Sequence, residues 1–375
     1  MGGTAMHKGI QYIGRKQFVL LLVLSNLFSY LTYYPRASAG QVEFGSSIAG
    51  LVLGNLAVWG IGALFFALED GTGKNLCDFM LFYNRPLGRL YNGLLAAFLG
   101  LSAAHSICGF VRFLNREIFP QSSYLVFLIP FLGVLIFGVV VGIESFARTA
   151  SVIFVCAALS VALIFFGTVG NVEPSALRAY SQVRWTGLWG TFVAVLQSNV
   201  ELLLLFTLVK HLAQRTPSVF QGYFWLATGG SVGLSLLVKL ALGNYAQMQQ
   251  YPFYALAVSS DLSVVQRLDS FYLVIWVLIS FVRVTALLLA LCTALQGVLP
   301  DRRYNSGVWT ALSLVAALSA AVGASSRLYE WLTALVKGCF APLTLALLPL
   351  LYVFYKRTVG RGEKTRGGAR GEAVH

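Results

Sequence analysis

The stretch LWGTFVAVLQSNVELLLLFTLV, residues Leu188–Val209, is an apolar run long enough to cross a bilayer. Its middle carries four polar side chains, Gln197, Ser198, Asn199 and Glu201. An ionisable group near the bilayer centre costs about 2.5 to 3.5 kcal/mol on insertion scales, so it normally faces a bundle interior or a water-filled cavity. Two interpretations stay open: a ligand or ion site inside a helix bundle, and a structural hydrogen bond between packed helices.

The composition of the chain fixes its class. Hydrophobic residues make up 57% of the sequence and charged residues 11%, which is not the composition of an ordinary soluble domain. The sequence therefore predicts an all-α, multi-pass membrane protein in contact with the lipid bilayer. The net charge of +13 comes from short connections and the C-terminal tail, so it predicts contact with lipid headgroups and no nucleic-acid partner.

Ten apolar runs follow one another along the chain, and each is long enough to form a transmembrane helix. They are Phe18–Tyr34, Ser46–Leu68, Leu90–Phe110, Tyr124–Ile143, Ser151–Thr168, Leu188–Val209, Tyr223–Leu242, Phe271–Leu295, Val308–Ala324 and Trp331–Tyr355. The polar segment Glu69–Arg89 reads equally as a short amphipathic helix at the membrane surface or as a plain loop. The long connection Gly243–Ser270 is predicted to fold back onto the membrane surface.

The basic residues between the spans lie mostly on one side of the predicted membrane. Because Lys and Arg favour cytoplasmic connections, this asymmetry predicts that both termini are cytoplasmic. Residues 1–355 would form a single domain of ten transmembrane helices. Residues 356–375 are rich in Gly, Arg and Lys and are predicted to be a disordered cytoplasmic tail against anionic lipid.

The ten spans divide into two halves of five, about residues 10–168 and 188–355. The first span of each half carries polar residues at its centre, and in the first half these are Ser25, Asn26 and Ser29, which share one helix face. Because five is odd, the two halves must point in opposite directions, as in transporters built from a 5+5 inverted repeat. Such transporters bind substrate at the membrane midplane between two broken helices. Neither cluster contains a glycine, so continuous helices with polar faces remain an alternative.

Two further spans carry candidate functional residues. His105 lies in the outer half of the third span, where a lone histidine is more often a packing residue than a ligand. Arg283 lies near the middle of the eighth span, where a permanent cation needs a counter-charge or carbonyl oxygens. Glu201 is one candidate partner for it.

The run from Ile13 to Tyr355 resembles the B-type, permease-like subunits of spore germinant receptors, in the spore germination protein family. The most specific match is YPFYALAVSSDLSVVQRLDSFYLVIWVLISFVR, residues Tyr251–Arg283, with its Tyr-Pro start, its Arg267-x-Asp269 pair and Trp276. IGRKQFVLLLVL near the N-terminus, GIESFAR after the fourth span and Glu201 are similar to other landmarks of that family.

The resemblance implies a LeuT-type fold of the amino acid–polyamine–organocation superfamily. It also implies a subunit in the spore inner membrane that works beside a larger A-type membrane subunit and a C-type lipoprotein and senses nutrients such as amino acids. In that interpretation the ligand lies in a midplane pocket between helices 1, 3, 6 and 8. The expected ligand-binding residues are Ser25, Asn26, Ser29, His105, Gln197, Ser198, Asn199, Glu201 and Trp276, with Glu201 and Arg283 as expected ion or coupling residues.

Other classes of function stay open beside sensing. One is a secondary transporter that couples amino acid uptake to protons or sodium, with Glu201 as proton carrier. Another is a scaffold in which the polar helix centres only lock the packing. We expect neither an enzyme nor a cofactor or metal site. The sequence has no paired catalytic carboxylates, no nucleophile beside a base, no metal-ligand cluster and no phosphate-binding loop.

Overall fold

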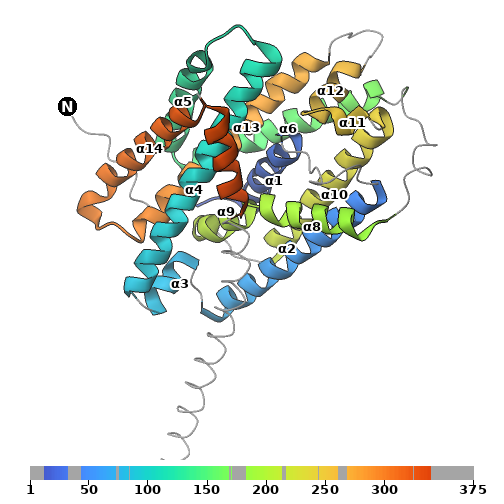
Figure 1. Ribbon diagram of the computed structural model, residues 1–375. Coiled ribbons are helices and arrows are strands. Elements are labelled where there is room, and N and C mark those ends of the chain that lie inside the picture. The colour runs from blue at the N-terminus through green and yellow to red at the C-terminus, as the bar shows by residue number, and fades with distance from the viewer. Residues whose placement is uncertain are drawn as a thin grey trace, which may run out of the picture.

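The chain folds as a bundle of helices around a small number of deeply buried ones (Figure 1). The computed structural model describes residues 12–32, 44–72, 76–83, 85–168, 170, 183–212, 217–243, 245–260, 268–323 and 325–338. Within these ranges the one β-type pairing is an isolated parallel bridge between Ile13 and Leu212. The prediction of an all-α protein is therefore confirmed.

The helices occupy the predicted apolar runs in order. They are α1 (Arg15–Thr32), α2 (Phe44–Thr72), α3 (Leu76–Tyr83), α4 (Arg85–Phe113), η1 (Leu114–Ile118), α5 (Tyr124–Val141), α6 (Ile143–Thr168), α8 (Trp185–Ser198), α9 (Glu201–Leu208), η3 (Val209–His211), α10 (Pro217–Leu242), α11 (Tyr245–Met248), α12 (Pro252–Ser259), α13 (Asp269–Gln296) and α14 (Asp301–Gly323). Residues 326–338 form a further helix. Helix α3 shows that the segment Glu69–Arg89 contains a short helix, and α11 and α12 lie within the connection Gly243–Ser270.

Eight of the described helical segments are long and apolar enough to cross a membrane. Helix α1 and residues 326–338 are not among these eight, but they occupy the places of the first and tenth predicted spans. The first turn of α1 holds Arg15, Lys16 and Gln17, which lower its mean hydropathy. The remainder of the tenth predicted span, the basic tail and residues 33–43 lie outside the described residues.

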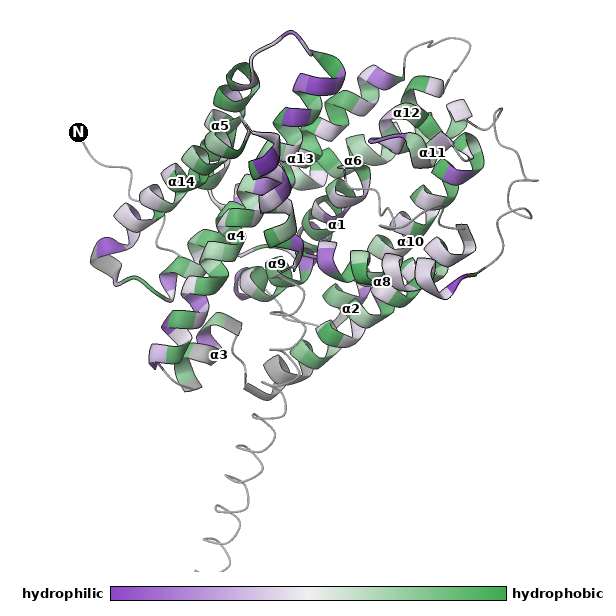
Figure 2. Ribbon diagram, viewed as in Figure 1, coloured by the Kyte–Doolittle hydropathy of each residue, from purple (hydrophilic) through white to green (hydrophobic). Residues whose placement is uncertain are grey.

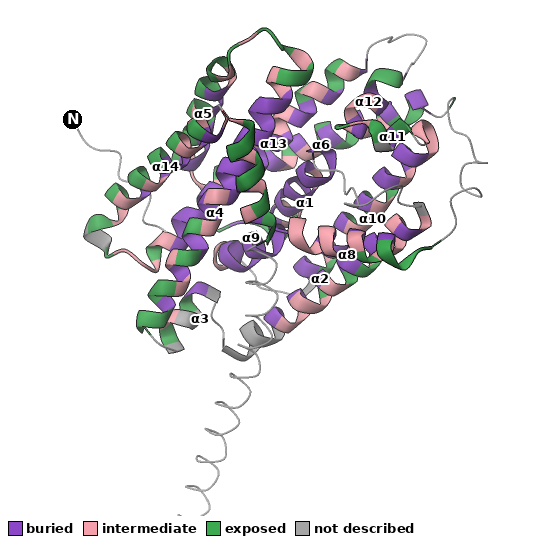
Figure 3. Ribbon diagram, viewed as in Figure 1, coloured by how far each residue is buried: buried purple, intermediate pink, exposed green. Residues whose placement is uncertain are grey.

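Burial divides the helices into a central and a peripheral group. Helices α1, α4, α9 and α13 are mostly buried, whereas α5 and α14 expose much of their surface (Figure 3). The outer helices expose large apolar side chains, among them Val126, Ile129 and Phe137 on α5. Figure 2 shows that the residues of α5 are mostly hydrophobic. Since exposed apolar faces of this extent suit lipid better than water, the pattern is that of a bundle immersed in a bilayer.

Helix α8 lies against α2 at very short range because two glycines face it. A methyl group added at Gly50 would stand 2.5 Å from the carbonyl oxygen of Leu188, and one at Gly54 would stand 2.8 Å from Cβ of Val195. Small residues let transmembrane helices approach closely enough for extensive van der Waals contact. The Gly/Ala-rich second span thus fixes the position of α8.

The other half of the sixth span, α9, is attached to the start of α1. The amide of Ile13, just before α1, donates to the carbonyl of His211 at 2.7 Å, just after α9. This bond and the Ile13–Leu212 bridge join the start of α1 to the end of α9. The two halves of the sixth span therefore have different attachments: α8 packs closely on α2, while α9 is joined to the start of α1 and also stacks Phe206 on Phe65 of α2.

Candidate functional site

The sixth predicted span is interrupted at the polar cluster that lies at its centre. Helix α8 ends at Ser198, Asn199 has the non-helical angles φ −86° and ψ 58°, and α9 begins at Glu201. The hydroxyl of Ser198 donates to the carbonyl of Val195 at 3.2 Å, a local bond of the kind by which short polar side chains compete with helical structure. Helix α1 shows no such interruption between Arg15 and Thr32. The broken-helix prediction is therefore confirmed for the sixth span, while the first span is the continuous alternative.

A buried ion pair lies directly beneath the break. Arg283 on α13 donates from Nη1 to Oε1 of Glu201, and both side chains are almost fully buried. Ser25 Oγ donates to the same carboxylate oxygen at 3.1 Å. The counter-charge predicted for Arg283 is thus Glu201, which stands in the first turn of α9, where the positive end of the helix dipole favours a carboxylate.

Arg283 also binds the continuous helix α1. Its Nη1 donates to the main-chain carbonyl of Ser25 at 2.7 Å, and its Nε donates to Ser106 Oγ at 3.3 Å. The guanidinium carbon lies 5.3 Å from the centre of the Phe28 ring, a cation–π distance. One side chain therefore joins α13 to α1, α4 and α9. A buried charge needs this number of partners to offset its desolvation.

A second polar link joins α1 to the break. The amide of Asn26 donates to the hydroxyl of Tyr223 on α10 at 3.4 Å, and this hydroxyl donates to Oδ1 of Asn199 at 3.4 Å. All three side chains are buried. Asn26 and Asn199 therefore face the same tyrosine from two predicted half-repeats, and the polar centres of the first and sixth spans are brought together.

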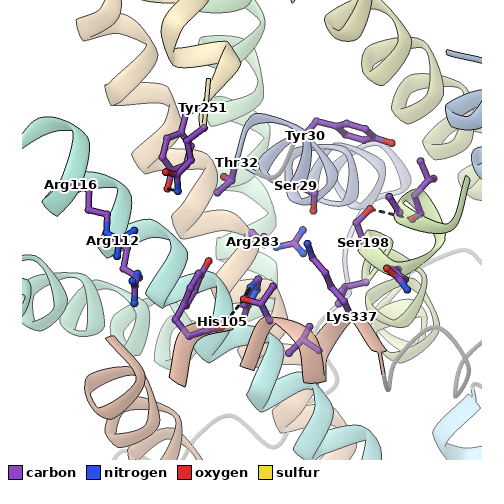
Figure 4. Close-up of a pocket in the computed structure, with 18 residues that line it drawn as sticks. Ser29, Tyr30, Thr32, His105, Arg112, Arg116, Ser198, Tyr251, Arg283 and Lys337 are labelled. Atoms are coloured by element: carbon purple, nitrogen blue, oxygen red, sulfur yellow. Dashed lines mark hydrogen bonds between the residues drawn. The ribbon is translucent and has the colours of Figure 1, made fainter. Parts of the chain in front are cut away.

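A cavity of about 300 Å³ lies beside these two links (Figure 4). Its walls come from α1, α4, η1, α8, the break, α13, helix 326–338 and the segment before α12. The lining residues are Ser29, Tyr30, Thr32, His105, Arg112, Arg116, Ala194, Val195, Gln197, Ser198, Val200, Gln250, Tyr251, Arg283, Tyr329, Thr333, Val336 and Lys337. The cavity runs from the break towards the end of the bundle where α4 terminates, at which Arg116 and Gln250 are exposed.

One wall of the cavity is held together by aromatic and basic side chains. His105 Nε2 lies 3.1 Å from Thr333 Oγ1, and its ring stacks on Tyr329 with a centroid distance of 5.4 Å. Arg112 donates to the carbonyl of Ser325 at 3.3 Å and to Oγ of Ser326 at 2.9 Å. Helix 326–338 is therefore fixed to α4 at its first residues and along its face.

The hydroxyl of Ser29 lines this cavity without a hydrogen-bond partner among the described residues. Ser29 is buried, and an unsatisfied buried hydroxyl costs about 1–3 kcal/mol relative to a satisfied one. Oε2 of Glu201 is likewise buried without a described partner. Ser29 belongs to the cavity lining, whereas Glu201 lies beside the cavity and outside the lining.

The structure sorts the residues predicted for the site into three groups. Ser29, His105, Gln197, Ser198 and Arg283 line the cavity. Ser25, Asn26, Asn199 and Glu201 form the two hydrogen-bonded links beside it. Trp276 lies elsewhere.

Trp276 is fully buried in an aromatic cluster with Phe28, Phe110 and Phe113, where its ring centroid lies 4.3 Å from that of Phe113. Its indole N–H donates to Thr32 Oγ1 at 3.1 Å. Thr32 lines the cavity and Trp276 does not, so the tryptophan stands one residue removed from it.

Several residues of the cavity, and Tyr223 beside it, are not found by a sequence-based search. Arg112 and Arg116 are four residues apart at the end of the third span, so they share one helix face. This spacing predicts a basic face, but it does not show that the face borders a cavity. Lys337 lies near a span end, where lysine is expected to extend to the membrane surface. Nothing in the sequence distinguishes Tyr223 from the many other tyrosines of the chain.

Comparison with solved structures identifies the fold. A Na⁺-coupled sialic acid symporter, solved in a substrate-bound outward-open state, matches with a TM-score of 0.65 over 91% of this chain and 79% of its own. The sequence identity is 10%, so the likeness shows the fold, which is the LeuT type. No curated protein sequence matches the chain.

The sequence itself matches a family model. The model described as spore germination protein, or spore permease, covers residues 12–326, which include every described helix up to and including α14. The match extends through the break, the ion pair of Glu201 with Arg283 and most of the cavity lining. The chain is an integral, multi-pass membrane protein of LeuT-type fold that belongs to the spore germination protein family.

Proposed function

We propose that this protein is the nutrient-sensing, permease-like subunit of a spore germinant receptor, and that it binds an amino acid-type molecule in the cavity between α1, α4, the α8–α9 break and α13. The observation that carries the proposal is the polar cavity at an interrupted helix, in a chain of the spore germination family. A pocket of this size with a few converging polar groups suits a small molecule.

Binding produces a signal only if the ligand prefers one conformation of the protein. Its contacts would lie on both sides of the break, with Ser198 and Gln197 on α8 and Arg283 joined to Glu201 on α9. A ligand that bridges α8 and α1 stabilises one angle between α8 and α9, and the population shift equals its differential affinity for the two angles. Net transport is not required for this.

The proposed membrane and partner subunits are those that the family resemblance implies. The chain would work in the spore inner membrane beside an A-type membrane subunit and a C-type lipoprotein, with both termini cytoplasmic. In that orientation the cavity extends from the membrane centre to the outer side, where Arg116 and Gln250 are exposed. A nutrient from outside the membrane would then reach the break without crossing it.

Direct binding tests the proposal. The purified full chain is mixed with a panel of amino acids and sugars, and binding is read from thermal shift and calorimetry. The Ser29→Ala variant is expected to weaken binding about 2- to 10-fold, the equivalent of one hydrogen bond, with no loss of stability because Ser29 Oγ has no described partner. Ser102→Ala is the matched control, since Ser102 Oγ is also buried without a described partner but does not line the cavity. Equal effects of both variants, or no binding by the folded chain, would contradict the proposal.

A coupled secondary transporter is the alternative. The observation that favours it is Oε2 of Glu201, a buried carboxylate oxygen with no described partner beside the break, in a fold shared with a symporter. Uptake of a labelled amino acid into vesicles that hold this chain alone, driven by a proton or sodium gradient, would support transport. Binding without uptake would support sensing.

A further inference from the structure

The cavity is lined by cations and, among the described residues, by no carboxylate. Its basic side chains are Arg112, Arg116, Arg283 and Lys337. The charge of Arg283 is offset by Glu201. Arg112 and Arg116 bind the neutral oxygens of Ser325 and Ser326, and no ion pair within the described ranges involves Arg112, Arg116 or Lys337. Three positive charges around this cavity are therefore not neutralised by the part of the chain that the structure describes.

The basic side chains lie in two places along the cavity. Arg283 and Lys337 stand near the break, and both line the same cavity as His105 (Figure 4). Arg112 and Arg116 stand on α4 and η1, towards the exposed end (Figure 4). Figure 4 shows the first pair beside Ser29 and Ser198 and the second pair below Tyr251. A ligand that occupies the length of the cavity would meet positive charge at both ends.

We infer that the ligand of this cavity is a small dicarboxylate of net negative charge, of the class of the acidic amino acids, with one carboxylate near Arg283 and Lys337 and the other near Arg112 and Arg116. This inference rests on the proposed function, since it names the substrate class of the same site. Guanidinium groups match carboxylates geometrically and bind them with charge-assisted hydrogen bonds. An ammonium group of such a ligand has the neutral oxygens of Ser29, Gln197 and Ser198 to bind.

A neutral amino acid fits the cavity less well for an electrostatic reason. Its one carboxylate can occupy only one of the two basic ends, so the cations at the other end gain no counter-charge from the ligand. This matters most for Arg112, which is buried and forms no described ion pair, because an uncompensated charge is far less favourable inside a low-dielectric bundle than in water. The same field attracts anions and raises their local concentration at the cavity mouth, an effect that salt screens.

The experiment compares ligands that differ in charge and not in size. Binding of glutamate and glutamine, and of aspartate and asparagine, is measured on the purified full chain at low and high salt. We expect the acidic member of at least one pair to bind about tenfold tighter or more, with the preference reduced at high salt. A neutral member that binds as tightly as its acidic partner overturns the inference and leaves the proposed function standing. A folded chain that binds no member of the panel overturns both.

A charge-removing variant tests whether this cavity is the site. Lys337→Gln takes away one cation from an exposed side chain that forms none of the described hydrogen bonds or ion pairs. It is expected to weaken binding of the acidic ligand about tenfold and binding of the neutral ligand by less, because the single carboxylate of the neutral ligand can bind at the other basic end. Arg303→Gln, the same charge change on α14 outside the cavity lining, is the control and should change neither. If Lys337→Gln does not fold, Arg116→Gln replaces it. An acidic ligand whose affinity is unchanged in the cavity variant overturns the inference.

Discussion

The first and sixth spans carry similar polar clusters at their centres, yet α1 is continuous and the other span is two helices. Neither cluster contains a glycine, so flexibility of the chain does not explain the difference. In α1 the side chain of Ser25 points to Glu201, and its carbonyl accepts a bond from Arg283 while the helix continues. In the sixth span Ser198 bonds to the main chain of its own helix, and Asn199 adopts a non-helical conformation.

The comparison shows what interrupts a membrane helix. An interruption frees backbone groups that must find partners, because none can be supplied by lipid. At Asn199 the side chain is bound by Tyr223, and Glu201 begins a new helix whose positive end it stabilises. Helix α1 instead keeps its own backbone bonds and uses its side chains to hold the break next to it. The continuous helix α1 and the broken sixth span thus contribute to the same set of buried polar contacts.

The largest expected effect comes from the ion pair that joins both spans. Replacing Arg283 by Met leaves Glu201 buried without its counter-charge, and breaking a buried pair in this way costs about 3–5 kcal/mol. Thermal unfolding of the purified chain measures the loss. The double variant Arg283→Met with Glu201→Leu should recover much of it, because apolar replacements of both partners leave no charge buried. Additive losses in the double variant would show that the two residues do not form a unit.

A smaller effect is expected where α8 is seated on α2. Leucine at Gly54 meets Cβ of Val195 and must push α8 away, and overpacking of this kind costs about 1–3 kcal/mol. Gly60→Leu is the matched control, since a Cβ atom added at Gly60 on the same helix meets nothing within 4 Å. The difference in melting temperature between the two variants measures how much the close packing of α8 on α2 contributes to stability. Equal melting temperatures would mean that α8 is not fixed by α2.

The smallest effect is expected at the tyrosine between Asn26 and Asn199. Tyr223→Phe removes the hydroxyl that binds both amides, and interhelical hydrogen bonds in membranes contribute about 0.6 kcal/mol on average. Tyr272→Phe removes a buried hydroxyl that has no described partner, so it should be neutral or slightly stabilising. Chemical or thermal unfolding of both variants gives the comparison. Ligand affinity should fall in the Tyr223 variant alone, because only that hydroxyl holds the break.

The sequence predicts the bundle well because hydropathy and length decide which segments cross a membrane. It also predicts the pairing of Arg283 with Glu201, since a buried cation requires a counter-charge and few carboxylates lie inside the spans. The meeting of Asn26 and Asn199 follows from the expected likeness of the two halves.

Other features depend on packing that no local pattern encodes. Trp276 was expected in the pocket, but its ring fills a space between Phe28, Phe110 and Phe113 that only the assembled helices define. Lys337 looks like an ordinary lysine near a helix end until helix 326–338 is placed against α4. At the break, Asn199 is hydrogen-bonded by Tyr223, which comes from another helix, so sequence alone leaves both alternatives open.

The bond between Ile13 and His211 has a mechanical consequence. It closes a ring of attachments with the Ser25–Glu201 bond, because Ser25 lies in the middle of α1, Glu201 is the first residue of α9, and Ile13 and His211 lie just outside the two helices. Helix α8 has no hydrogen bond in this ring and packs against α2, whose Phe65 also stacks on Phe206 of α9. Asn199 and Val200 thus connect two helices with different attachments, so the angle between α8 and α9 is set by both sets of contacts.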